Sequence, residues 1–170
     1  MSQIDLECGG LVRLDAYMAD DLSVVNSARV SFGKRTETMS VADKGLIRFL
    51  MRERHGTPFE HNAFRFHVSV PIFVAREWFR HRIGWSYNEY SARYSEMPKN
   101  WYIPETEVVR SQVGKPGSYT FEPLDPERGR EVAETINEAN SHSYRTYQYL
   151  IEIGVAKELA RTVLPVGMFT

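Results

Sequence analysis

The sequence contains only one cysteine, Cys8, among its 170 residues. A single thiol excludes a disulfide bond within the chain and every zinc site built from several cysteines. Cys8 is followed by Gly9 and Gly10, and paired glycines are typical of a turn. We therefore expect a turn at this position and no role for Cys8 as a nucleophile.

The sequence also lacks an excess of charge of one sign and a long apolar run. Its 21 lysines and arginines against 22 aspartates and glutamates give a net charge of −1, so no overall positive field attracts nucleic acid polymers. No stretch approaches the roughly 18–20 apolar residues of a membrane-spanning helix. The first ten residues do not join a basic region to an apolar stretch. We expect a cytoplasmic protein that binds neither nucleic acid polymers nor membranes.

Several motifs that mark active sites are absent. The glycine-rich phosphate-binding patterns GxGxxG and GxxxxGK[ST] do not occur. Ser86 and Ser91 lack the GxSxG turn that exposes a serine nucleophile. The evenly spaced His55, His61 and His67 cross a predicted turn and a predicted strand, and no carboxylate pattern accompanies them. The residues therefore identify no catalytic nucleophile and no metal site.

Hydrophobic periodicity predicts two strands in the first half of the chain. Residues 11–17 follow the paired glycines and read as a short strand. In residues 64–70, Phe64, Phe66 and the two valines after them alternate with polar residues. Strict alternation is the pattern of a strand with one face buried, so we expect residues 64–70 to be half-buried.

Capping residues, prolines and glycines predict helices in several places. The stretch Glu105–Glu127 is rich in glycine and proline, and we expect a loose segment near a subunit contact or the substrate entrance. Strands and helices together predict a single α/β domain over residues 1–170. The predicted helices are 21–30 after Asp20 or Asp21, 41–55 between the capping box Ser40/Asp43 and Gly56, 72–83 after Pro71, 126–153 between Asp125 and Gly154, and 156–164.

The densest group of polar side chains lies between residues 80 and 94. Arginine binds phosphate oxygens through paired hydrogen bonds, and serine and asparagine add neutral donors, so one interpretation is a site for phosphorylated nucleotides. The alternative is a solvated helix face on which the arginines pair with Glu77 and Glu89. Three consecutive residues, Arg-His-Arg, cannot all face one side of a helix, because neighbours point about 100° apart. An ordinary amphipathic helix therefore does not explain this triplet. The group comprises Arg80, His81, Arg82, Ser86, Asn88, Glu89, Ser91, Arg93 and Tyr94.

Two further sets of residues have both a functional and a structural interpretation. The stretch His55–His61 can line a pocket with hydrogen-bonding groups, or its side chains can bond to the backbone of a turn. The aromatic residues near position 80 can stack on a flat ligand, or they can pack against each other in the core. These aromatic residues are Trp78, Phe79, Trp85, Tyr87 and Tyr90.

The string RHRIGWSYNEYSARY, residues 80–94, resembles the signature of the flavin-dependent thymidylate synthases. That signature reads Arg-His-Arg, a short spacer, then Ser-x-Arg-Tyr. The likeness extends along nearly the whole chain in ordered blocks, which makes it far more specific than one motif. The other blocks are ARVSF (28–32), HGTPFEH (55–61), PIFVAREWFRHR (71–82), WYIP (101–104) and ELARTVLP (158–165).

The resemblance implies an α/β subunit with an antiparallel sheet and flanking helices. It implies a homotetramer in which several subunits build each FAD site. The implied reaction transfers a methylene group from methylenetetrahydrofolate to carbon 5 of dUMP. Reduced flavin, recharged by NADPH, completes the methyl group with a hydride, and no enzyme cysteine need attack the ring.

Carried over position by position, the resemblance also implies the site residues. Ser91 and Arg93 are expected to hold the dUMP phosphate, and the flavin ring to stack on the uracil. The expected cofactor-binding residues are Ser31, His55, Thr57, Glu60, Arg80, His81, Arg82 and Glu89. The expected substrate-binding residues are Glu77, Trp78, Phe79, Arg80, Glu89, Tyr90, Ser91, Ala92, Arg93 and Arg161.

The sequence departs from the family pattern in three respects. Glu77 stands where many members have glutamine, and the spacer between Arg82 and Ser91 is one residue longer than in the commonest form. The family continues past the position of Thr170 with a flavin-binding Asn-Ala-Arg-Ser segment and an arginine that polarises the uracil. We therefore expect the C-terminal helical part of the family to be missing, so that the chain is inactive or belongs to a longer active protein.

Two other functions remain open on the sequence. The first is the same chemistry on UMP, in a specialised nucleoside pathway, because nothing in these residues selects against a 2′-hydroxyl. A non-catalytic module that binds flavin or nucleotide is the second alternative.

Overall fold

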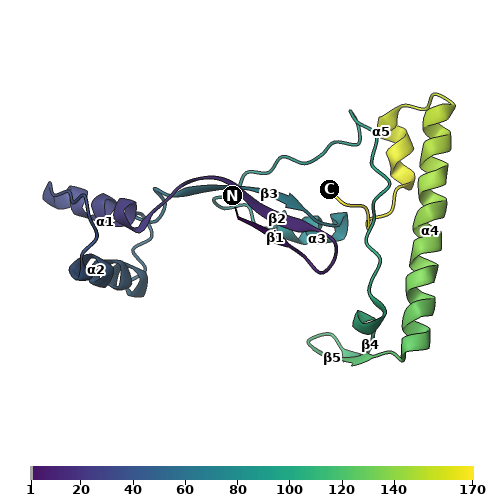
Figure 1. Cartoon of the computed structure of the whole chain (residues 1–170), viewed down its shortest axis with the longest axis horizontal. Helices are drawn as coiled ribbons and strands as arrows, with labels where there is room; N and C mark the ends of the chain where they lie inside the picture. The colour runs from purple at the N-terminus through teal and green to yellow at the C-terminus, as the bar shows by residue number, and fades with distance from the viewer. Residues whose placement is uncertain (1) are drawn as a thin grey trace. The chain divides into compact units, whose positions relative to one another are not determined.

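A computed structural model describes residues 2–170 (Figure 1). Contacts within the chain cluster into two compact units. Unit 1 comprises Val12–Val68 together with the N-terminal residues up to Ile4, and unit 2 comprises Asp5–Leu11 and Ser69–Thr170. The single-domain organisation expected from the sequence stays a prediction.

A three-stranded sheet is formed by β1 (Gln3–Asp5), β2 (Leu11–Met18) and β3 (Ala63–Ser69), in the order β1-β2-β3. The strands predicted at residues 11–17 and 64–70 are therefore confirmed, whereas β1 was not predicted. Between β1 and β2 the chain turns at residues 7–9, and at Gly10, just after the turn, a Cβ atom would lie 2.3 Å from the carbonyl oxygen of Ser69. Only glycine fits at this position, because the approach is closer than any side chain permits.

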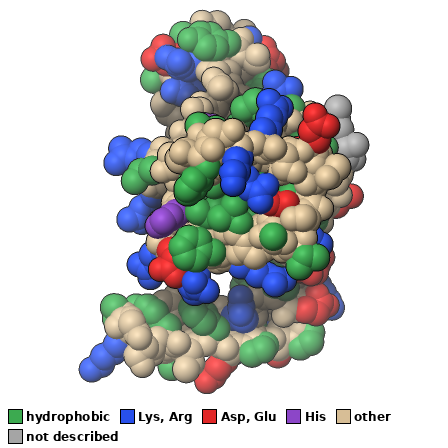
Figure 2. Space-filling model, turned by 90° about the vertical axis from the view of Figure 1, so that its left-hand side faces the viewer, with side chains coloured by type: hydrophobic (Ala, Val, Ile, Leu, Met, Phe, Trp, Pro, Cys, Tyr) green, Lys and Arg blue, Asp and Glu red, His purple; other side chains and the backbone are tan. Residues whose placement is uncertain are grey.

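Strand β3 is more exposed than the half-buried strand expected from the sequence. Phe64 and Phe66 stack on each other, with ring centroids 6.2 Å apart, but remain 60% and 44% exposed. The alternating pattern predicted the strand correctly and its burial wrongly, because the described residues do not cover these rings. Figure 2 shows hydrophobic side chains on the surface of the molecule, interspersed with lysines, arginines and acidic residues.

Two helices of unit 1 begin where their capping residues predicted. Helix α1 (Asp21–Arg29) follows Asp20, whose side chain accepts a hydrogen bond from the Ser23 amide, and the short 3-10 helix η1 (Val30–Phe32) continues it. Helix α2 (Val41–Arg52) starts with the predicted capping box of Ser40 and Asp43. The predicted end at Gly56 is wrong, because the chain leaves the helix after Arg52.

Unit 2 contains the remaining helices and a hairpin. The predicted helix 72–83 ends early, since α3 (Ile72–Trp78) stops before the arginines. The stretch predicted to be loose is ordered: η2 (Thr106–Val108) precedes an antiparallel hairpin of β4 (Arg110–Lys115) and β5 (Ser118–Pro123). The last helices agree with the prediction, and they are α4 (Pro126–Glu152), α5 (Lys157–Ala160) and the 3-10 helix η3 (Arg161–Val163).

The core of unit 2 forms where α4 meets the C-terminal segment. Tyr147, Met168 and Ala160 are almost fully buried, and Met97 and Tyr144 pack with them. Partly buried apolar side chains of α3, α4 and η3 surround this cluster. Burying apolar surface stabilises by about 25 cal/mol per Å², so this cluster stabilises the unit. No helix within residues 2–170 combines the length and apolar character needed to cross a membrane.

A buried ion pair joins the two helices of unit 1. The guanidinium group of Arg29 contacts the carboxylate of Asp43, which is only 1% exposed. Hydrogen bonds from Ser40, together with the charge of Arg29, lower the pKa of Asp43. Because the pKa is lower in the folded state, ionised Asp43 stabilises the fold above its unfolded pKa. That stabilisation is lost as the pH falls through the folded pKa.

We expect Asp43→Asn to lower the melting temperature by several degrees at neutral pH and by much less in acid. The substitution leaves Arg29 without its partner and removes the charge that acid would otherwise neutralise. Thermal unfolding followed by circular dichroism across this pH range measures the difference. Asp21→Asn, at an exposed aspartate of α1, is the matched control; an equal loss in both variants would contradict the assignment.

Candidate functional site

The Arg80-His81-Arg82 triplet lies in a turn immediately after α3, not on a helix as the sequence predicted. The helix ends at Trp78, and the His81 amide donates to the Trp78 carbonyl oxygen at 2.9 Å. Arg80 is exposed and lies 3.5 Å from the carboxylate of Glu77. An exposed pair of this kind contributes little to stability, so both groups can exchange partners when a ligand binds.

An aromatic cluster holds this turn in place. The indole rings of Trp78 and Trp85 meet edge to face at 5.8 Å, and Trp85 stacks on Tyr87 at 6.0 Å. Phe79 contacts Tyr87 from the other side, with centroids 4.8 Å apart. The Tyr87 hydroxyl donates to the carbonyl oxygen of His81 at 2.7 Å. These four aromatic residues therefore pack against each other, as the structural interpretation has it, but outside the buried core, since Trp85 remains 45% exposed; the fifth, Tyr90, lines the pocket described below.

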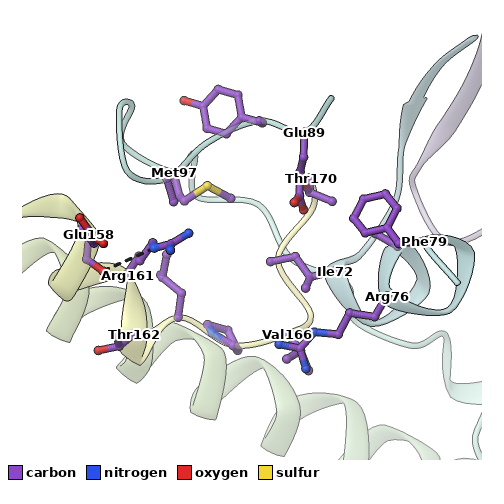
Figure 3. Close-up of a pocket in the computed structure, with 15 residues that line it drawn as sticks. Ile72, Arg76, Phe79, Glu89, Met97, Glu158, Arg161, Thr162, Val166 and Thr170 are labelled. Carbon is purple, nitrogen blue, oxygen red and sulfur yellow. Dashed lines mark hydrogen bonds between the residues drawn. The ribbon is translucent and has the colours of Figure 1, made fainter. Parts of the chain in front are cut away.

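A pocket of about 490 Å³ lies beside the turn, within unit 2 (Figure 3). One wall is the α3 face, another is the irregular segment 89–97, and a third comes from α5, η3 and the residues that follow them. The wall is mostly apolar with a few charged groups, the usual make-up of a small-molecule site. The lining residues are Ile72, Ala75, Arg76, Phe79, Glu89, Tyr90, Ala92, Met97, Glu158, Arg161, Thr162, Leu164, Pro165, Val166 and Thr170.

The charged residues of the pocket lining are two arginines and two glutamates. Arg76 and Arg161 enter it from different elements, and within residues 2–170 neither forms an ion pair with a carboxylate. Arg161 instead donates from Nε to the backbone oxygen of Glu158 at 3.4 Å (Figure 3). The Glu89 carboxylate accepts a hydrogen bond from the Thr170 hydroxyl at 2.9 Å. Guanidinium groups without an anionic partner are suited to bind an anion such as a phosphate.

The pocket contains half of the residues expected to bind substrate. Ser91 and Arg93 lie next to it in sequence; the Ser91 hydroxyl accepts from the Arg93 amide at 3.4 Å, and the Arg93 guanidinium lies 5.0 Å from the Tyr94 ring centroid. Trp78 belongs to the aromatic cluster, and Glu77 to the pair with Arg80. The expected residues that line the pocket are Phe79, Glu89, Tyr90, Ala92 and Arg161.

Four residues expected at the cofactor site lie in unit 1. Ser31 is in η1, and His55, Thr57 and Glu60 follow α2. The His55 ring meets Phe49 edge to face at 6.0 Å, and the Glu60 amide donates to the Thr57 carbonyl oxygen at 3.2 Å. Arg80, His81, Arg82 and Glu89 lie in unit 2. In the described part of the chain, no three His, Cys, Asp or Glu side chains are grouped to hold a metal ion.

Sequence reasoning missed Arg76 as a site residue. Ile72, Ala75, Arg76 and Phe79 follow the spacing i, i+3, i+4, i+7, which places them on one face of α3, and all four line the pocket. This periodicity was available in the sequence. No comparable local pattern in the sequence indicated that residues from 165–170 line the pocket.

Comparisons with known proteins agree with this geometry. The family model described as thymidylate synthase complementing protein matches residues 13–170. The flavin-dependent thymidylate synthase of Streptomyces coelicolor is 44% identical over 99% of this chain and 70% of its own length. The corresponding enzyme of Thermosipho africanus is 45% identical over 95% of this chain and 69% of its length.

Solved structures give the same result. The UMP/dUMP methylase PolB from Streptomyces cacaoi, bound with 5-Br UMP, superimposes with a TM-score of 0.83 and 41% identity. The match covers 98% of this chain and 70% of that one. The complex of PolB with 5-Br dUMP gives a TM-score of 0.84 and 40% identity, covering 98% and 72%. This chain belongs to the family of flavin-dependent thymidylate synthases, and the fold class expected from the resemblance is confirmed.

We expect Tyr87→Phe to loosen the turn that contains Arg80 and Arg82. The variant keeps the aromatic ring but loses the hydrogen bond to His81, so the turn opens more often. Trypsin cleaves after arginine, and cleavage at these two positions should become several times faster. Tyr149→Phe, at an exposed tyrosine of α4, is the control. Equal cleavage rates in both variants would show that the hydroxyl does not restrain the turn.

Proposed function

We propose that this protein is a flavin-dependent thymidylate synthase that methylates carbon 5 of the uracil of dUMP, with FAD, NADPH and methylenetetrahydrofolate. The observation that carries the proposal is the pocket with two arginines that pair with no carboxylate within residues 2–170, in a chain of this family. Its size suits a nucleoside monophosphate, and its apolar wall suits a flat base. Its lining contains no cysteine, in keeping with chemistry that needs no thiol nucleophile.

In the proposed complex, the arginines bind the phosphate of dUMP. Arg161 and Arg93 would supply guanidinium groups, and the Ser91 hydroxyl a neutral donor. Arg76, on the α3 wall, would add a further cation. A phosphate dianion gains most from such charge-assisted hydrogen bonds when it is withdrawn from bulk water. Phe79 and Tyr90 would then contact the apolar faces of the nucleotide.

The residues proposed for FAD suit its chemistry. FAD contains a pyrophosphate, and Arg80 and Arg82 lie in a turn with exposed guanidinium groups, the kind of donor that binds such oxygens. Within residues 2–170, Arg82 forms no ion pair that binding would have to break. His81, Glu89, Ser31, His55, Thr57 and Glu60 complete the proposed set.

We propose further that the protein works as a homotetramer whose FAD sites combine residues from several subunits. The exposed rings of Phe64 and Phe66 on β3 support this, because large apolar groups on a surface mark contacts with other chains. Bound FAD in its reduced state supplies a hydride. The residues of the chain hold the nucleotide and the cofactor in mutual orientation and exclude water from between them.

We expect Arg161→Gln to lower kcat/KM for dUMP by roughly 10- to 100-fold, mainly through KM. A lost charge-assisted hydrogen bond to phosphate costs about 1.5–3 kcal/mol, which corresponds to this range. Release of tritium from dUMP labelled at carbon 5 measures turnover of the full-length protein with FAD, NADPH and the folate.

Arg145→Gln is the control, because Arg145 is an exposed arginine of α4 outside the pocket. It should leave both constants unchanged. If the wild-type protein binds FAD but releases no tritium, it is a non-catalytic flavin-binding module. If it neither turns over dUMP nor binds flavin, the proposed function is wrong.

A second candidate substrate is UMP. The solved structures at 40–41% identity belong to a UMP/dUMP methylase, bound to 5-bromo derivatives of both nucleotides. One missing hydroxyl contact changes specificity only where the site has a group that binds it. Paired measurements of kcat/KM for dUMP and UMP decide between the two, and a clear excess for dUMP supports a thymidylate synthase. Equal values would make the protein a methylase of both nucleotides.

A further inference from the structure

One wall of the pocket consists of a segment without regular secondary structure. Residues 89–97 form neither a helix nor a strand, yet Glu89, Tyr90, Ala92 and Met97 all line the pocket. Within the segment, the Tyr94 and Ser95 amides donate to the Ser91 carbonyl oxygen, each at 3.0 Å. A single turn of this kind does not hold nine residues in one conformation, so other contacts must fix the segment.

Two tyrosines of α4 supply those contacts. The Met97 amide donates to the Tyr147 hydroxyl at 3.1 Å, and the Tyr144 hydroxyl donates to the Met97 carbonyl oxygen at 2.9 Å. Tyr147 is 1% exposed and Tyr144 is 7% exposed. Both backbone polar groups of Met97 are therefore satisfied by side chains more than forty positions away in sequence.

Packing alone does not require hydroxyl groups at these positions. The two rings pack at 5.8 Å from each other within the apolar core, where phenylalanine would fill the same space. Burial raises the pKa of Tyr144, so its hydroxyl stays protonated and remains a donor at neutral pH. A second brace, from the Tyr90 hydroxyl to the Glu96 carbonyl oxygen at 2.8 Å, acts on the same segment.

We propose that Tyr144 and Tyr147 are positioning residues for nucleotide binding. By holding Met97 at both backbone groups, they fix segment 89–97 against α4 and so set the pocket wall that includes Glu89 and Tyr90. The same anchor holds Ser91 and Arg93 beside the pocket before the ligand arrives. A preordered segment loses less conformational entropy on binding than a mobile one, and affinity rises accordingly. This inference rests on the proposed function, because it concerns binding of dUMP.

The test compares the dissociation constant for dUMP in four variants of the full-length protein, measured by isothermal titration calorimetry. We expect Tyr147→Phe to weaken dUMP binding about tenfold, and Tyr144→Phe to act in the same direction, because an unanchored segment must be ordered on binding. At saturating dUMP, kcat should stay within about twofold of the wild type, since the reacting groups are intact.

Two controls separate positioning from a loss of stability. Leu150→Ala removes an apolar side chain packed against the same core and lowers the melting temperature without removing either hydrogen bond to Met97. Tyr149→Phe removes an exposed hydroxyl from the same helix. Both should bind dUMP like the wild type. Hydrogen exchange of a peptide covering residues 91–97 should accelerate in Tyr147→Phe more than in Leu150→Ala.

The outcomes distinguish the inference from the function on which it rests. If the wild type binds dUMP and the two tyrosine variants bind it equally well, the inference is overturned and the proposed function stands. If Leu150→Ala weakens binding as much as Tyr147→Phe, the hydroxyl groups have only a structural role. If the wild type does not bind dUMP, the proposed function fails, and the inference fails with it.

Discussion

The pocket depends on backbone hydrogen bonds between residues 166–170 and the junction that leads into α3. The Ile72 amide donates to the Met168 carbonyl oxygen at 2.8 Å, and the Phe73 amide to that of Val166 at 3.0 Å. Val70 and Thr170 exchange a reciprocal pair, at 3.2 and 2.9 Å. Because Met168 is fully buried between these bonds, the segment is fixed on both sides. The walls contributed by α3 and by residues 165–170 therefore form together.

The charges within this frame are arranged so that the cations remain available. Of the two glutamates in the lining, Glu89 accepts a hydrogen bond from the Thr170 hydroxyl, and Glu158 bonds to Arg161 through its backbone oxygen. Two guanidinium groups in one pocket, neither of which forms an ion pair within residues 2–170, repel each other, and an entering anion relieves that repulsion. The net charge of −1 is no guide to this local field. Affinity for a phosphorylated ligand is a property of the pocket and not of the whole chain.

Local signals predicted where helices begin and where α4 ends, but they failed to predict the ends of α2 and α3. The starts at Asp20, Ser40 and Asp125 depend on side chains that bond to amides within the next few residues, so sequence alone contains them. Helix α2 ends before Arg54, which adopts a left-handed conformation with φ of 56°. No residue type at that position announces this change. Helix α3 ends where the aromatic cluster begins and where the Tyr87 hydroxyl bonds to the His81 carbonyl oxygen. These contacts form only in the folded chain.

The hairpin of β4 and β5 was missed although a signal was present. Its turn contains Pro116 and Gly117, a pair typical of a tight turn between strands, but the glycine and proline content suggested a loose segment instead. In the site, motif resemblance identified Phe79, Glu89 and Arg161, and helical spacing could have added Arg76. The wall formed by residues 165–170 was beyond sequence reasoning, because tertiary hydrogen bonds alone place it.

The sequence distance across the pocket has a consequence for folding. Glu89 and Thr170, which bond to each other at its rim, are 81 positions apart. Closing so long a loop is entropically costly, and contacts between residues so far apart in sequence slow folding. A ligand that bridges the walls binds only the completed fold, and it therefore shifts the unfolding equilibrium by mass action. A bound ligand of this kind would therefore also protect the chain against proteolysis of its unfolded state.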